Sequence, residues 1–264
     1  MLTVLTATYN RAYTLSRLYE SLERQTNKSF EWVVVDDGSA DETLELLAGF
    51  QKKSTFPIRF LQQENSGKHV AINTGVSVET RGWIFLVDSD DALTPDAVEV
   101  FLSDLTNTGS KDLVGYCYRR ADFSGRLIGN VVSGEPESSA IMSPVQAGPL
   151  YRGDLAYIFK KDVLIKCPFP RFEGENFVPE LLIWNKVSDE GGVLYFHHRA
   201  IYLCEYLADG YSANFYKNLQ RNPVGFGVFY KDQMGRETNL IRKLKCAIRY
   251  VQCLFFGFKN RRNV

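Results

Sequence analysis

A run of apolar residues ends abruptly in acids near position 88, and this boundary constrains the fold more than any other feature. Residues 84–87 (IFLV) are apolar, whereas residues 88–91 (DSDD) are polar and include three carboxylates. A continuous apolar run predicts a strand covered on both faces, with the acids at its carboxyl end, where open α/β sheets bind ligands. The acids favour Mg²⁺ or Mn²⁺ beside a phosphate, although acids followed by Thr94 and Pro95 also suit the start of a helix.

Two more predicted strands end in the same way. Residues 32–35 (WVVV) lead into Asp36 and Asp37, and residues 2–7 (LTVLTA) lead into the polar residues 8–11 (TYNR). Parallel strands joined by helices have their carboxyl ends at one edge of the sheet. We therefore expect the three polar loops to meet in one crevice, rather than to form three unrelated solvated turns.

The first 105 residues alternate predicted strands and helices, which is a Rossmann-like pattern. Thr94 and Pro95 are typical of a helix start, and apolar residues at helical spacing follow at 98–105. Residues 124–150 are rich in Gly, Ser and Pro, which predicts a long loop. Beyond this loop the pattern mixes a short helix with Pro-rich and acidic segments.

The last segment is predicted to be an amphipathic helix with excess positive charge. Residues 236–264 hold eight Lys or Arg against one acid, although the formal net charge of the whole chain is zero. Because the basic excess is local, it argues against a general nucleic-acid surface. The predicted apolar face consists of Leu240, Ile241, Leu244, Ala247, Ile248, Val251, Leu254 and Phe255. We expect this face to pack on its own domain or a partner, with an anionic bilayer as the open alternative.

Length and composition exclude several classes of protein. A chain of 264 residues with 45% apolar content can form one large domain, or a domain with an appendage. The N-terminal residues have no signal-peptide or membrane-span pattern, which predicts a cytoplasmic location. Five widely spaced cysteines do not predict a disulfide framework or a zinc site. His69, His197 and His198 are too scattered to predict a histidine metal site.

Four segments occur in the order and spacing of the inverting family 2 glycosyltransferases with the GT-A fold. These segments are TATYNR at 6–11, VVVDDGSADET at 33–43, ENSGK at 64–68 with AIN at 71–73, and FLVDSDD at 85–91. The chain resembles that family over residues 2–105. It is also similar to a bacterial subgroup through Gly153-Asp154, residues 168–170, residues 173–180 with Trp184, and Glu205 to Ser212.

The resemblance implies an α/β fold of the GT-A (Rossmann-like) type. Its central sheet would be mixed but mainly parallel, flanked by helices, with a C-terminal helical extension. Residues 1–105 would form the nucleotide-sugar-binding half and residues 106–228 the acceptor-binding half of the same domain. Residues 229–264 would be a basic amphipathic helical tail. The chain lacks the Gln-x-x-Arg-Trp motif of processive synthases, which favours transfer of a single sugar.

The resemblance also implies roles for individual residues. The nucleotide-sugar contacts would be Thr8, Tyr9, Arg11, Asp36, Asp37, Lys68, Asn73 and Asp88. Asp88 and Asp90 would be the Asp-x-Asp pair that holds Mn²⁺ or Mg²⁺. A metal held by short carboxylates can neutralise the charge that develops on a departing diphosphate.

The general base is the least certain of the implied roles. Many relatives have Glu-Asp at the start of the acceptor-side helix, with the Asp as the base, but the matching pair here is Glu180-Leu181. Glu180 is the first candidate and Glu175 the second, with Asp154 and Glu173 as further alternatives. An acid in a first helical turn can instead serve only to stabilise the helix.

The expected function is metal-dependent transfer of one sugar in the synthesis of a cell-surface polysaccharide. The donor would be a UDP- or dTDP-sugar and the acceptor a glycan or lipid-linked molecule, with peripheral contact of the tail with the inner face of the membrane as an open alternative. A sugar nucleotidyltransferase would share the fold and metal chemistry, but it normally has a Gly-rich loop after the first strand. A non-catalytic relative that binds nucleotide sugars is the other alternative. The sequence leaves the sugar, the acceptor and the oligomeric state open.

Overall fold

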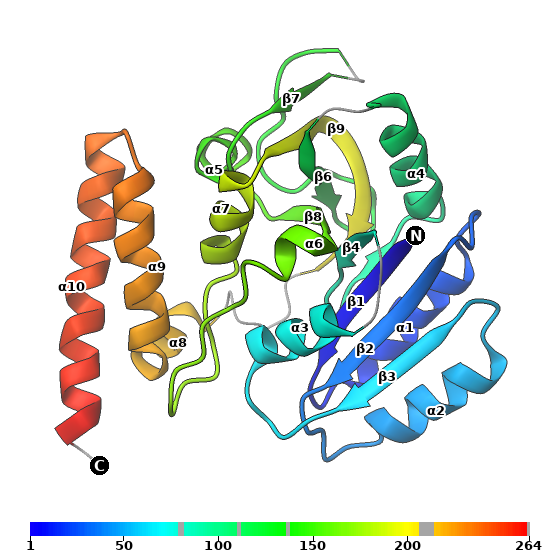
Figure 1. Ribbon diagram of the computed structural model, residues 1–264, viewed down its shortest axis with the longest axis horizontal. Helices are drawn as coiled ribbons and strands as arrows, with labels where there is room; N and C mark the ends of the chain where they lie inside the picture. Colours follow the sequence, from blue (N-terminus) through cyan, green and yellow to red (C-terminus); the bar gives the residue numbers. More distant parts are fainter. Residues whose placement is uncertain (79–81, 110–111, 136–137, 206–213, 263–264) are drawn as a thin grey trace.

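The computed structural model describes all residues except 79–81, 110–111, 136–137, 206–213 and 263–264, and it contains one central sheet between two layers of helices (Figure 1). The strands are β1 (Leu2–Thr8), β2 (Phe30–Asp36), β3 (Ile58–Gln62), β4 (Trp83–Leu86), β5 (Ala92–Leu93), β6 (Leu113–Ala121), β7 (Ser139–Ile141), β8 (Leu155–Lys160) and β9 (Gly192–Leu203). The helices are α1 (Ala12–Glu23), α2 (Thr43–Lys53), α3 (Lys68–Ser77), α4 (Ala97–Asn107), α5 (Pro144–Tyr151), α6 (Lys161–Leu164), α7 (Leu181–Asp189), α8 (Phe215–Arg221), α9 (Pro223–Arg236) and α10 (Leu240–Arg262).

The sheet has the order β3-β2-β1-β4-β8-β6-β9-β5, with β7 beside β9. Strands β3, β2, β1 and β4 are parallel, as expected. Beyond them the sheet is mixed, because β8 is antiparallel to both β4 and β6 whereas β6 and β9 are parallel. The carboxyl ends of β1, β2 and β4 therefore lie at one edge, so the prediction that their loops meet is confirmed.

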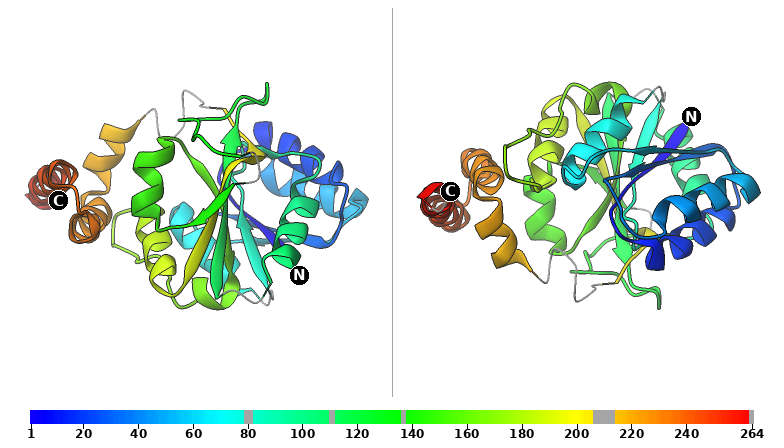
Figure 2. Two further views of the ribbon diagram at one scale, coloured as in Figure 1. Left: turned by 90° about the horizontal axis from the view of Figure 1, so that it is seen from above. Right: turned by 90° about the horizontal axis from the view of Figure 1, so that it is seen from below.

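The alternation of side chains along each strand fills two cores, one on each face of the sheet. Val4 and Trp32 lie in the core under α1, α2 and α4, whereas Leu5 and Val33 lie in the core under α3, α5 and α7. Strand β4 follows the same rule, because Ile84 and Phe85 lie in opposite cores. Apolar residues without alternation thus mark strands buried on both faces, and the helix layers are visible end-on in Figure 2.

The helix predicted to start with Thr94 as its N-cap begins two residues later than expected. Helix α4 begins at Ala97, with Asp96 at its N-cap position. The backbone N–H of Thr94 instead donates to the carbonyl of Ile201 in β9, at 3.1 Å. Pairing with β9 therefore extends the β5 edge before the helix can begin.

The predicted long loop over residues 124–150 is also wrong for its second half. Residues 139–141 form β7 on the edge of β9, and α5 begins at Pro144. Ser143 and Gln146 form a reciprocal capping box at the start of α5. This Ser-Pro-x-Gln pattern was readable in the sequence, because capping residues and an early Pro are typical of helix starts.

The predicted boundary at residue 229 falls inside α9. Helix α10 packs on α9 and α8 and forms the outer layer of the molecule (Figure 1). None of the described helices is long and apolar enough to cross a membrane. All five cysteines are free thiols. Within the subgroup segment from Glu205 to Ser212, the positions after Glu205 lie outside the described residues.

Gly67 occupies a backbone position that accepts no side chain. It precedes α3 with a φ of 95°, and an added Cβ would lie 2.0 Å from the carbonyl oxygen of Asn176. Its N–H donates to Asp37 Oδ2 at 2.8 Å. A loop of the first half of the chain thus contacts a loop of the second half, backbone against backbone.

We expect Gly67→Ala to lower the free energy of unfolding by about 1–3 kcal/mol from backbone strain alone, because the left-handed conformation disfavours a Cβ. The matched variant is Gly49→Ala in α2, where an added Cβ meets nothing within 4 Å. It should raise stability by about 0.4–1 kcal/mol. Urea unfolding of both variants is the measurement. Equal midpoints for Gly67→Ala and the wild type would contradict the close approach at Asn176.

Candidate active site

A cleft of about 610 Å³ lies at the carboxyl ends of β1, β2 and β4. Its wall on the side of these strands includes Thr8, Tyr9, Arg11, Asp37, Lys68, Asp88, Ser89, Asp90 and Asp91. Glu180 lies on the opposite side, at the start of α7, and α8 and α9 close the far end. The cleft thus brings together most of the residues that the sequence singled out.

Two of the predicted nucleotide-sugar contacts, Asp36 and Asn73, are not among the residues that line this cleft. Asp36 is fully buried, and its carboxylate accepts hydrogen bonds from the backbone and side chain of Ser39. Asn73 exchanges two hydrogen bonds of 2.9 Å with the backbone of Phe169. Both side chains hold neighbouring segments in place, and the direct donor contacts expected of them stay a prediction.

Asp37 lines the cleft but is also tied to the next loop. Its Oδ1 accepts hydrogen bonds from Gln63 Nε2 at 2.7 Å and from the backbone N–H of Ser66 at 2.9 Å. Its Oδ2 accepts the N–H of Gly67. One carboxylate therefore holds the segment that leads into α3. This segment fixes the position of Lys68, the first residue of that helix.

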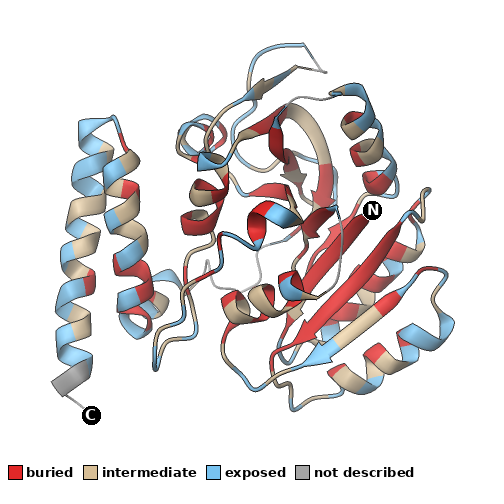
Figure 3. Ribbon diagram, in the orientation of Figure 1, coloured by how far each residue is buried: buried red, intermediate tan, exposed pale blue. Residues whose placement is uncertain are grey.

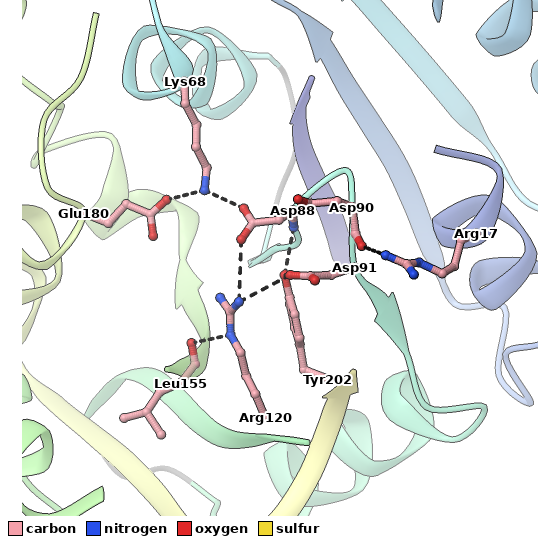
Figure 4. A network of polar contacts seen from close by, with 9 residues as sticks. All are labelled: Arg17, Lys68, Asp88, Asp90, Asp91, Arg120, Leu155, Glu180 and Tyr202. Carbon is pink, nitrogen blue, oxygen red and sulfur yellow. Dashed lines mark hydrogen bonds and ion pairs between the residues drawn. The ribbon is translucent and has the colours of Figure 1, made fainter. Parts of the chain in front are cut away.

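Lys68 joins the two sides of the cleft (Figure 4). Its Nζ lies 2.5 Å from Asp88 Oδ1 and 2.7 Å from Glu180 Oε1. Burial alone would lower the pKa of Lys68, but the attraction of the two carboxylates outweighs burial and raises it. The ammonium is therefore firmly charged, and it links the end of β4 to the start of α7.

A second cation, Arg120, lies beneath the acids, and the sequence patterns did not single it out. Its Nη1 is 3.4 Å from Asp91 and 3.6 Å from Asp88, and its Nε donates to the carbonyl of Leu155 at 3.1 Å. Its guanidinium lies 4.0 Å above the ring of Tyr202. The Tyr202 hydroxyl donates to Asp91 at 2.7 Å and accepts the N–H of Asp88. The sequence signal was the pair Arg119 and Arg120 within the otherwise uncharged strand β6.

Burial acts on all three acids, and the cations decide which of them stay ionised. For Asp88, burial raises the pKa, but Lys68 and Arg120 outweigh burial and bring it to about 2. For Asp91, burial and repulsion by Asp88 raise the pKa to about 7 against the attraction of Arg120. Burial and the charge of Asp88 also raise the pKa of Asp90. Asp88 therefore stays ionised. Its negative charge acts on the two neighbouring acids, Asp90 and Asp91, and raises the pKa of both.

Asp88 and Asp90 suit a divalent cation that arrives with a phosphate ligand. Both line the cleft and offer the hard oxygens that Mg²⁺ and Mn²⁺ prefer, and a cation between them would offset the repulsion that raises the pKa of Asp90. The described residues contain no group of three or more His, Cys, Asp or Glu placed to form a complete metal cage. Mg²⁺ commonly binds one or two carboxylates and completes its shell with water and substrate phosphates, so the pair fits.

Glu180 lies where the sequence predicted, directly before α7. Its backbone carbonyl accepts the N–H groups of Ile183 and Trp184, which fixes its position on the helix. Its carboxylate pairs with Lys68 rather than capping the helix N–H groups. The side chain of Glu180 therefore does not serve to cap α7.

The carboxylate of Glu175, the second candidate base, caps a helix. Its two carboxylate oxygens accept the N–H groups of Val224 and Gly225 at 2.7 Å, at the start of α9. Burial raises the pKa of Glu175 against these bonds. Of the remaining alternatives, Asp154 lines the cleft, whereas Glu173 is exposed and is not among the lining residues.

The far end of the cleft is an aromatic wall, which the sequence patterns also did not single out. It consists of Phe177, Phe215, Phe226, Phe229 and Tyr230. The ring of Phe226 lies 5.3 Å from that of Phe177 and 5.8 Å from that of Phe215. The spacing of 226, 229 and 230 was readable as one helix face. Apolar aromatic walls beside a few polar groups are typical of sites for small organic ligands.

Residues 3–131, just under half of the chain, match the family model for glycosyl transferase family 2. Chondroitin synthase of Escherichia coli is 37% identical over 123 residues, which are 46% of this chain and 18% of that protein. Glycosyltransferase GlyA of Streptococcus pneumoniae serotype 4 is 33% identical over 117 residues, which are 44% of this chain and 17% of that protein. The chain therefore spans less than a fifth of these two curated relatives.

Solved structures match the chain over nearly its whole length. Residues 1–349 of TarS from S. aureus, in complex with UDP-GlcNAc, superpose with a TM-score of 0.63 at 17% identity, covering 98% of this chain and 72% of that one. The mannosyltransferase PcManGT of Pyrobaculum calidifontis, in complex with GDP-Man and Mn²⁺, gives 0.58 at 16% identity, covering 97% and 73%. The fold is GT-A, as predicted, and the sequence matches support a family 2 glycosyltransferase.

The raised pKa of Asp91 makes a prediction about stability and pH. An ordinary Asp carboxyl has a pKa of 3.8, whereas Asp91 keeps its proton in the folded protein up to about pH 7. Between these values the folded state binds more protons than the unfolded chain, so its stability falls as the pH rises. Asn cannot ionise, and we therefore expect the unfolding temperature of Asp91→Asn to rise relative to that of the wild type from about pH 4 to about pH 7.

Thermal unfolding at a series of pH values measures this difference. The matched control is Asp162→Asn, which replaces an exposed carboxylate in α6. A wild-type advantage over Asp91→Asn that grows between those pH values would show that Asp91 is ionised in the folded protein.

Proposed function

We propose that the protein is an inverting family 2 glycosyltransferase that moves one sugar from a nucleotide diphosphate sugar to an acceptor, with Mg²⁺ or Mn²⁺. The observation that carries the proposal is the meeting of Asp88, Asp90 and Glu180 in one cleft, with Lys68 between them. Diphosphate-binding groups and a candidate base thus lie on two sides of one space. The solved neighbours that hold UDP-GlcNAc, or GDP-Man with Mn²⁺, support a nucleotide-sugar donor and a divalent metal.

The proposed reaction is a direct displacement at the anomeric carbon. The acceptor oxygen forms a bond to that carbon while the bond to the diphosphate breaks, and the diphosphate leaves with the electron pair. Glu180 takes the proton of the acceptor hydroxyl. Asp88 and Asp90 would hold the metal, which when bound would neutralise the charge that develops on the diphosphate.

Lys68 connects donor binding with the proposed base. In the structure its ammonium is shared by Asp88 and Glu180. A diphosphate is a strong competing partner for an ammonium, because charge-assisted hydrogen bonds to phosphate are short and strong. We therefore expect donor binding to draw Lys68 away from Glu180, so that Glu180 faces the acceptor once the donor is in place.

The wider setting in the proposal is the cytoplasmic synthesis of a cell-surface polysaccharide, with a UDP- or dTDP-sugar as donor and a glycan or lipid-linked acceptor. The loop after β1 (residues 8–11) contains no glycine, unlike the phosphate loop of sugar nucleotidyltransferases, and the comparisons do not favour that alternative. A non-catalytic relative would bind nucleotide sugars without turnover. A screen of nucleotide sugars with Mn²⁺, read out as donor hydrolysis and transfer, separates the two.

The first prediction of this proposal concerns the metal. Asp90→Asn should abolish turnover and weaken UDP binding chiefly when Mn²⁺ is present, because the variant loses a charged ligand. Calorimetric titration of UDP with Mn²⁺ and with chelator is the measurement, and Asp162→Asn is the control of equal charge change. The metal assignment is wrong if the affinity is the same with metal, with chelator and in Asp90→Asn.

The second prediction concerns the base. Glu180→Gln should preserve the fold and donor affinity but lower the transfer rate by at least about 10²-fold, as is typical of losing a general base. Glu190→Gln at the other end of α7 changes an exposed residue and should have no such effect. Glu175→Gln should reduce transfer less, through a weaker start of α9.

Rates are measured with saturating donor after circular dichroism has verified the fold. Near-normal transfer by Glu180→Gln together with an inactive Glu175→Gln would reverse the assignment. Activity in both variants would make Asp154, which lines the same cleft, the next residue to replace.

A further inference from the structure

Helix α10 turns its apolar face away from the rest of the molecule. The expected stripe is exposed rather than packed, with exposed fractions of 53–79% for its large apolar side chains. These residues, here called the outer stripe, are Leu240, Ile241, Leu244, Ile248, Val251, Leu254, Phe255 and Phe258. In Figure 3 exposed residues recur along the whole length of the helix, between residues of intermediate burial. This corrects the expectation that the stripe is the packing face.

A different face of α10 holds the helix in place. Cys253 is buried with Phe226 of α9, and a Cβ at Gly227 would lie 3.5 Å from Cys253 Cβ. Phe256 packs edge-on against Tyr216 of α8 at 5.9 Å between ring centroids. Because the inner face already makes these contacts, the outer stripe is not needed to attach the helix.

Basic residues flank the outer stripe on the exposed surface. With about 3.6 residues per turn, Lys243 and Lys245 lie on opposite edges of the stripe, and Lys259 lies at its C-terminal end. All three are exposed. The other two described basic residues turn inward, since Arg242 pairs with Glu237 and Arg249 lies over the ring of Phe215.

Negative charge is almost absent from this surface. The sequence of α10 contains seven Lys or Arg and no Asp or Glu. The acids that lie nearest along the chain are already paired, Glu237 with Arg242 and Asp232 with Arg236. The surface therefore combines a long apolar stripe with an uncompensated positive border.

We propose that the outer stripe binds an anionic lipid bilayer, with α10 lying in the plane of the headgroups. The apolar side chains enter the boundary of the acyl chains, and the flanking lysines contact anionic headgroups. Solvent-exposed apolar patches of this extent are typical of interaction surfaces. The flanking lysines favour an anionic bilayer over a second copy of this chain. Two outer stripes placed face to face would bring two positively charged borders together, and these would repel each other.

The proposal does not depend on the transferase activity. It does indicate from which side of the cleft each substrate would enter. Helix α9 contacts α10 through Gly227 and contributes Phe226, Phe229 and Tyr230 to the cleft. The aromatic wall therefore lies one helix layer from the proposed bilayer surface, while the nucleotide-binding loops lie on the far side of the cleft (Figure 1). A donor would enter from solution and a lipid-linked acceptor from the membrane side.

Co-sedimentation with vesicles tests the proposal. The full chain should bind vesicles that contain phosphatidylglycerol and not vesicles of phosphatidylcholine alone. Leu244→Gln with Phe255→Gln should weaken binding at least about tenfold, because large apolar side chains no longer leave water. The matched control, Ile141→Gln with Ile165→Gln, changes two exposed apolar residues elsewhere and should bind like the wild type.

The charge is tested separately. Lys243→Gln with Lys245→Gln should lower binding to the anionic vesicles by about fivefold for each lysine, whereas Lys52→Gln with Lys166→Gln on other exposed surfaces should not. Raising the salt concentration should reduce the difference in binding between the wild type and Lys243→Gln with Lys245→Gln, because salt screens exposed charges.

Tryptophan fluorescence locates the contact. The three native tryptophans, Trp32, Trp83 and Trp184, are buried, so the emission of an exposed tryptophan in Phe255→Trp can be followed above theirs. Anionic vesicles should shift that emission to the blue, and Ile165→Trp should not respond. Absence of vesicle binding, or binding that the stripe variants leave unchanged, would overturn the proposal. So would a dimer that Leu244→Gln with Phe255→Gln disperses, since it would assign the stripe to a second copy.

Discussion

The interaction on which the site depends is one ammonium shared by two carboxylates. Lys68 at the start of α3 contacts Asp88 after β4 and Glu180 before α7, so three elements meet at one charge. Partly buried charges are tolerated only where they are paired, and removing one partner leaves the others uncompensated. Arg120 supports the same arrangement from below by balancing Asp88 and Asp91. The shape of the cleft is therefore set by an electrostatic balance as well as by packing.

The loops that end β1, β2 and β4 were predictable from the sequence, because an apolar strand followed by acids is a local pattern. Glu180 was predictable for the same reason, since it begins a helix. Arg120 and Tyr202 were not, because they meet the acids only through the pairing of β6 with β9, across some eighty residues of chain. The side-chain roles of Asp36 and Asn73 also escaped prediction, because the residue type alone does not distinguish a ligand from a residue that holds a turn.

Sequence similarity and structural similarity cover different parts of the molecule. The family model ends at residue 131, whereas the structural match to TarS extends over nearly all of this chain. The region beyond residue 131 contributes Glu180 and the aromatic wall of α8 and α9. Likeness in fold does not identify a substrate, because one fold can carry different residues at its site.

The contact between Gly67 and Asn176 restricts how new specificity can arise. At that point two backbones meet without any side chain between them, so substitution has no means of widening or narrowing the space. Variation among descendants, or a library made in the laboratory, would therefore leave this contact almost unchanged. Adaptation to another substrate is directed instead to half-buried side chains that line the cleft, such as Phe229 and Tyr230 of α9. The cleft thus combines a backbone contact that tolerates little mutation with an aromatic wall that can vary.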